Sequence, residues 1–92
     1  MRQLDLFERD YADLVHECEK AEVAYDRAAR EEAEERYGDY QDLVETGTEI
    51  LADLRDHFAS TLGERQADEY EAEFNRAVRK RFPRLSTEIE NR

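Results

Sequence analysis

Apolar residues recur along the first third of the chain at alternating spacings of three and four. The series contains no charged residue and consists of Leu4, Phe7, Tyr11, Leu14, Cys18, Ala21, Tyr25 and Ala28. This spacing is the a/d pattern of a coiled-coil-like helix that presents one narrow apolar seam to another helix. The pattern predicts a first helix over about residues 3–37, which ends at Gly38 because glycine adopts the C-cap conformation without strain.

A second apolar series predicts a helix over about residues 39–61. It passes through Tyr40, Val44, Leu51, Leu54 and Phe58. Gly47 lies inside this series, and we expect the helix to continue through it, although an interior glycine costs about 1 kcal/mol relative to alanine. The alternative is a break at 46–48, where Thr48 would cap a new helix.

A third helix is predicted over about residues 64–82. Gly63 precedes it, and Tyr70, Phe74, Val78 and Phe82 lie along one of its faces. Pro83 ends the helix because proline cannot donate the helical hydrogen bond. The remaining residues, 84–92, hold only Leu85 and Ile89 as apolar anchors, and we expect this tail to be loosely ordered.

These elements predict a single all-α domain over residues 1–83. Short connections favour antiparallel neighbours, so the expected fold is a three-helix up-down-up bundle or a long helical hairpin with a third helix. A chain of 92 residues buries only a modest share of its surface. We therefore expect a homodimer that completes the core through Phe7, Tyr11, Leu14 and Cys18 of the first helix, although a closed monomer remains an alternative.

The charge composition is strongly one-sided. The chain has 25 acidic and 14 basic residues, for a net charge of −11, and only two of the basic residues, Lys20 and Lys80, are lysines. Abundant carboxylates with scarce lysine resemble the composition of small acidic helical proteins of halophilic archaea. That resemblance implies that the acidity serves solubility in brine, and the alternative is an acidic binding face. The excess of carboxylates also makes nucleic acid an unlikely partner of the whole chain.

The chain lacks the sequence signals of membrane insertion or export. It has no apolar run of about 18 residues, and residues 1–5 do not open a signal-peptide core. Cys18 is the single cysteine, which excludes an intrachain disulfide. We expect a cytoplasmic protein with no membrane partner.

Five basic residues cluster near the end of the third predicted helix, without an intervening acid: Arg76, Arg79, Lys80, Arg81 and Arg84. One hypothesis is that they contact the phosphates of a nucleic acid. The interpretation that we favour is structural, because cations complement the C-terminal end of a helix dipole. In an up-down-up bundle they would also pair with acidic residues at the end of the first helix, namely Glu31, Glu32, Glu34 and Glu35.

His16 and His57 are weak candidates for a metal site. If the first two helices fold back at Gly38, the two histidines come within one helical turn of each other, beside Asp13 and Asp53. Two carboxylate–histidine pairs at one level resemble the ligands of a first-row metal. Neither histidine lies on its helix's apolar seam, however, so we interpret both as surface residues and expect no metal.

No signature of catalysis or of cofactor binding is present. The chain has no glycine-rich phosphate loop and no nucleophile elbow. Cys18 lies on the seam between Glu17 and Glu19 and is expected to be a small buried apolar residue. The sequence therefore favours a non-enzymatic helical interaction or scaffolding protein without a cofactor. The alternatives are a nucleic-acid-associated regulator and, with less support, a metal-binding bundle.

Overall fold

The computed structural model describes all 92 residues and contains five helices and no strand. The helices are α1 (Arg2–Asp10), α2 (Ala12–Asp26), α3 (Ala33–Ala59), α4 (Glu64–Arg81) and α5 (Pro83–Ile89). The prediction of an all-α chain is confirmed.

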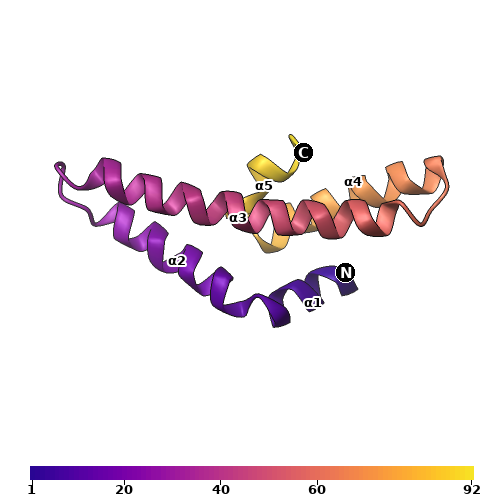
Figure 1. Cartoon of the computed structure of the whole chain (residues 1–92), viewed down its shortest axis with the longest axis horizontal. Coiled ribbons are helices and arrows are strands. Elements are labelled where there is room, and N and C mark those ends of the chain that lie inside the picture. The colour runs from indigo at the N-terminus through magenta and orange to yellow at the C-terminus, as the bar shows by residue number, and fades with distance from the viewer.

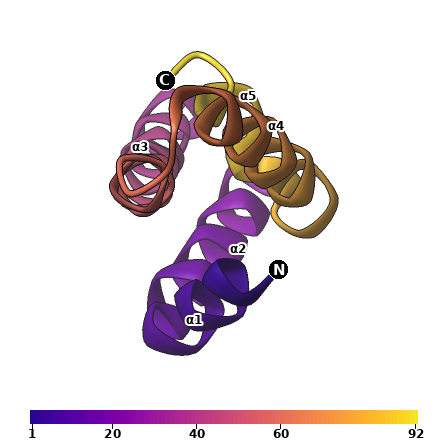
Figure 2. The ribbon, with the colours of Figure 1, turned by 90° about the vertical axis from the view of Figure 1, so that its right-hand side faces the viewer.

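The long helix α3 is the axis of the molecule. Helix α2 runs antiparallel to the N-terminal half of α3, and α4 runs antiparallel to its C-terminal half (Figure 1). In the view of Figure 2 the α1–α2 segment lies below α3, and α4 and α5 lie beside α3, so the three parts form the corners of a triangle. This offset makes the molecule elongated, with extents of 51 × 24 × 18 Å and a radius of gyration of 14.7 Å, against about 12 Å for a compact chain of this length.

The core lies where the helices overlap, near the middle of α3. Phe7 of α1 meets Phe82 edge to face, with ring centroids 5.3 Å apart. Leu4 and Leu51 are fully buried beside them. The complete buried cluster contains Leu4, Phe7, Val44, Leu51, Ala52, Phe74, Val78, Phe82, Leu85 and Ile89.

The prediction of one helix over residues 3–37 is wrong in two places. The helix is interrupted at Tyr11, whose φ of −121° and ψ of 31° separate α1 from α2. It then ends at Asp26, and the chain reverses over residues 27–32. The reversal places Glu34 and Glu35 in the first turn of α3, where carboxylates are stabilised by the helix dipole. At the end of a longer first helix the same dipole would have opposed them.

The glycines of α3 do not end the helix. Gly38 lies inside α3 and has no positive φ, so the prediction that it caps the first helix is wrong. Gly47 also lies inside α3, and the prediction that the helix continues through it is confirmed. The boundaries predicted for the third helix agree with those of α4 to within one residue.

The C-terminal tail is helical, which contradicts the expectation of a loose segment. Pro83 ends α4 and also occupies the first turn of α5, where its missing N–H needs no partner. Leu85 and Ile89 are four residues apart and therefore share one face of α5. Both are buried, with exposures of 4% and 0%, so the two anchors suffice to dock the tail on α3 and α4.

Candidate functional site

A pocket of about 260 Å³ opens between the α1–α2 segment and the corner where α4 meets α5. We call it the inter-helix pocket. Its lining is mainly apolar, and Gly47 of α3 contributes to it without a side chain. The complete lining consists of Phe7, Glu8, Leu14, Val15, Cys18, Glu19, Gly47, Arg81, Phe82, Arg84 and Leu85.

The two arginines at this pocket are paired with carboxylates of the chain. Arg81 of α4 donates hydrogen bonds to Asp5 and Glu8 of α1. Arg84 of α5 donates from Nε to Glu22 of α2 over 2.7 Å. These ion pairs tie the two walls of the pocket together, because each joins the α1–α2 segment to α4 or α5.

The ion pairs shift the pKa values of the carboxyl groups that form them. The hydrogen bond from Arg81 lowers the pKa of Asp5, and the hydrogen bond from Arg84 lowers the pKa of Glu22. Tyr40 donates a further hydrogen bond to the Glu22 carboxylate over 3.2 Å, and burial raises the pKa of Tyr40. Both carboxylates therefore stay charged to a lower pH than ordinary carboxyl groups do.

Cys18 and Gly47 shape the apolar part of the pocket. Burial raises the pKa of the Cys18 thiol, which keeps it protonated and weakly nucleophilic. A Cβ on Gly47 would lie 3.3 Å from both terminal methyl carbons of Leu85. The absence of a side chain at this position therefore lets Leu85 pack directly against α3.

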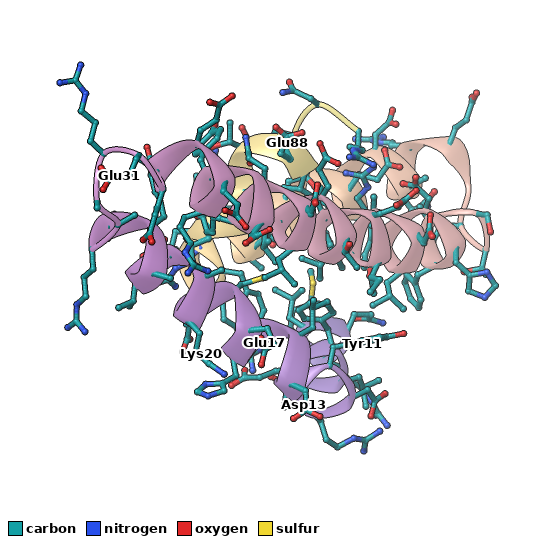
Figure 3. All side chains as sticks on the ribbon, turned by 60° about the vertical axis from the view of Figure 1, so that its left-hand side comes forward. Tyr11, Asp13, Glu17, Lys20, Glu31 and Glu88 are labelled. Carbon is teal, nitrogen blue, oxygen red and sulfur yellow. The ribbon has the colours of Figure 1, made fainter.

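The four residues expected to mediate self-association fall into two groups. Phe7 and Cys18 are buried inside the chain, with exposures of 1% and 4%. Leu14 is half-buried at the inter-helix pocket. Tyr11, at the break between α1 and α2, remains 39% exposed, and Figure 3 shows it beneath the C-terminal half of α3. Only Tyr11 and part of Leu14 are available to another molecule.

Tyr11 borders a second, shallower groove, which we call the Tyr11 groove. Its other lining residues come from α3 and are Ile50, Asp53, Leu54 and His57. Ile50 and Leu54 are half-buried, and Phe58, one turn further along α3, is 38% exposed. These three apolar residues are spaced by four and form one stripe along α3, which we call the α3 stripe.

The basic cluster is largely neutralised within the chain, but by different acids from those predicted. Arg81 and Arg84 pair with α1 and α2, as described above. Arg76 pairs with Glu73 over 2.9 Å, and Arg79 pairs with Glu90 over 2.6 Å. The predicted partners, residues 31–35, lie at the tip of the α2–α3 hairpin, where Figure 3 labels Glu31. That prediction fails because the hairpin turns at 27–32 instead of at Gly38.

The same change of register separates the two histidines. Contacts between Tyr25 and Tyr37, and between Glu22 and Tyr40, fix the pairing of α2 with α3. In this register His16 is level with about position 46, so His57 lies roughly 16 Å further along α3 at 1.5 Å per residue. The juxtaposition predicted from a turn at Gly38 is wrong. No three His, Cys, Asp or Glu side chains in the structure are grouped so that they could hold a metal ion.

One residue has a structural role that was not predicted from the sequence. Arg55 is 3% exposed and donates hydrogen bonds to Asn75 of α4 and to the Ile89 carbonyl of α5. The signal was present in the spacing, because Arg55 follows Leu51 by four residues on the buried face of α3. A charged residue at such a position is buried only when it has partners.

Comparisons of this chain with protein-family models, with curated proteins and with solved structures found no match. In the structure, no helix combines the length and the apolar character that crossing a membrane requires.

Proposed function

We propose that this chain is a non-enzymatic helical interaction protein that self-associates. The observation that carries the proposal is the α3 stripe, which no helix of the same chain covers completely. The stripe lies in the C-terminal half of α3, and Ile50 and Leu54 border the Tyr11 groove at the break between α1 and α2. Apolar residues left uncovered along one helix face favour packing against another helix.

A second copy of the chain is the partner that we assign to this surface. An antiparallel contact about a two-fold axis at Leu54 would set Ile50 of one copy against Phe58 of the other. The same arrangement brings Asp53 of one copy within about a turn of the other copy's His57. The surface is therefore self-complementary, as a two-fold interface requires. Tyr11, which borders the stripe, is the one residue of the N-terminal seam that would contribute substantially.

The chemistry of the inter-helix pocket supports the non-enzymatic part of the proposal. The arginines there are engaged in ion pairs, and the Cys18 thiol is held protonated by burial. A catalytic cysteine needs an electropositive setting and a base to form the thiolate. The intrachain ion pairs of the basic cluster likewise weigh against the nucleic-acid hypothesis, because they occupy four of the five charges that would contact phosphate, all but that of Lys80.

Sedimentation velocity tests the proposal. We expect a dimer whose population increases between 0.15 and 2 M NaCl, because salt screens the repulsion between two chains of charge −11 each. Leu54→Arg should raise the dimer dissociation constant at least a hundredfold. Val23→Arg is the matched control, since Val23 is 46% exposed on α2 and outside the stripe, and it should change the constant less than twofold.

A wild-type chain that sediments as a monomer at 0.1 mM in both salt concentrations would contradict self-association. Equal loss of dimer in Leu54→Arg and Val23→Arg would contradict the assignment of the interface to the α3 stripe. Circular dichroism of both variants establishes that they are as helical as the wild type.

A further inference from the structure

The inter-helix pocket is large enough to hold a ligand. Its volume of about 260 Å³ exceeds that of an engineered apolar cavity of about 150 Å³ that binds benzene. A benzene ring with a few further heavy atoms therefore fits. The pocket is built from different residues than the α3 stripe, so this inference is independent of self-association.

The walls of the pocket favour an aromatic occupant. Phe7 and Phe82 meet edge to face at 5.3 Å and both line the pocket. A further ring can pack against such a pair in an offset or edge-on geometry. Leu14 and Val15 of α2 also line it and are only half-buried, so a ligand that covers them removes apolar surface from water.

Water is poorly held in this part of the pocket. A buried water needs two to four polar partners, whereas Val15, Leu85 and the two phenylalanines offer none. Arg81 through its two Nη atoms, and Arg84 through Nε, already donate to carboxylates of the chain. An apolar ligand that displaces weakly held water gains affinity.

The charges around the pocket select against charged ligands. An anion would meet Glu8 and Glu19 in the lining, in addition to the net charge of −11. A cation would meet Arg81 and Arg84. We infer that the inter-helix pocket binds a small, neutral, single-ring aromatic molecule.

Four probes of similar size test this inference: toluene, benzyl alcohol, benzoate and benzylamine. Each is titrated into the full-length protein while the methyl resonances of Leu14, Val15 and Leu85 are followed by NMR. We expect saturable shifts with toluene and benzyl alcohol, and affinities at least tenfold weaker for benzoate and benzylamine. Nuclear Overhauser effects from the bound ring to the Leu85 methyl groups should place the ligand.

A pair of variants localises the binding. Val15→Phe fills the pocket from α2 and should weaken the affinity for benzyl alcohol at least tenfold. Val23→Phe makes the same change on the same helix outside the pocket and should leave the affinity unchanged. The inference is overturned if neither neutral probe gives saturable shifts up to its solubility, or if the charged probes bind as tightly. It is also overturned if Val15→Phe, folded by circular dichroism, binds like the wild type. If that variant does not fold, the wild type decides the question. A neutral probe that binds without nuclear Overhauser effects to the Leu85 methyl groups would then overturn the inference.

Discussion

Arg55 is the only charged residue that is buried in this chain, and it joins three helices. Its Nη1 atom donates to the Asn75 side chain over 3.0 Å and to the Ile89 carbonyl over 3.1 Å, while Nε donates to Asp56 over 2.8 Å. The Ile89 carbonyl lies at the C-terminal end of α5, where a positive charge also complements the helix dipole. The planar guanidinium can serve these acceptors together, which a lysine ammonium cannot.

Replacing Arg55 by methionine should destabilise the chain by about 2–4 kcal/mol. The change keeps most of the side-chain volume but leaves the Ile89 carbonyl and the Asn75 side chain without their donor, and hydrogen bonds to charged groups are the stronger ones. Urea denaturation of the variant measures this loss. Arg65→Met is the control, because the Arg65 side chain is 90% exposed, and it should stay within about 0.5 kcal/mol of the wild type. A loss below 1 kcal/mol for Arg55→Met would contradict the bridging role.

At the scale of the element, helix boundaries set by local residues were predicted correctly, and a boundary that depends on contacts between separate helices was not. Gly63 and Pro83 are local signals, and they placed α4 correctly. The turn at 27–32 has no glycine or proline, and its residues favour helix by propensity. Across this turn the rings of Tyr25 and Tyr37 meet, with centroids 5.3 Å apart. Such a contact between separate helices is not encoded in a local sequence pattern.

The candidate sites were harder to predict than the elements for the same reason. The inter-helix pocket combines Phe7 of α1, Cys18 of α2 and Gly47 of α3 with Phe82, which lies at the junction between α4 and α5. The apolar character of the three side chains was visible in the sequence. The place where they meet depends on the register of α2 against α3. Because the turn between these helices was expected at Gly38 instead of at 27–32, every contact predicted across the hairpin was shifted.

Gly38 offers a direct test of the corrected helix boundary. A glycine inside an exposed helix costs about 1 kcal/mol relative to alanine, and a Cβ at Gly38 would meet no atom within 4 Å. Gly38→Ala should therefore stabilise the chain by about 0.5–1 kcal/mol in urea denaturation. A C-cap glycine with positive φ would give the opposite sign, because alanine is strained there. A destabilised Gly38→Ala protein would thus contradict the continuity of α3.

At the scale of the whole molecule, oppositely charged pairs hold the α1–α2 segment against α4 and α5. Arg81 with Asp5 and Glu8, and Arg84 with Glu22, join α1–α2 to α4–α5 across the inter-helix pocket. Elsewhere the carboxylates outnumber their partners, since the net charge is −11. Acid therefore acts in two opposite ways: it relieves the general repulsion, and it removes these particular attractions. The total free energy of unfolding contains both effects, so the informative quantity is the difference in unfolding free energy between a variant and the wild type.

The Glu22–Arg84 pair separates the two effects. The pKa of Glu22 is lowered from its ordinary value of 4.5, chiefly by the hydrogen bond from Arg84. The contribution of the Glu22–Arg84 pair to the free energy of unfolding is therefore complete above about pH 5. It declines as the pH falls, because the carboxyl of the unfolded chain is protonated first, and it is lost below the native pKa. Because both side chains are about a third exposed, the contribution at pH 7 is at most about 1 kcal/mol.

Glu22→Gln should accordingly lower the unfolding free energy at pH 7 by up to about 1 kcal/mol, and the difference from the wild type should vanish by about pH 3. Once the wild-type carboxyl is protonated, it resembles the amide. Urea titrations at pH 7, 5, 4 and 3 in low salt measure the difference. Glu45→Gln, an exposed change on α3, controls for the general relief of repulsion. A deficit of Glu22→Gln that stays constant from pH 7 to pH 3 would show that the mutation acts through packing and not through the ion pair.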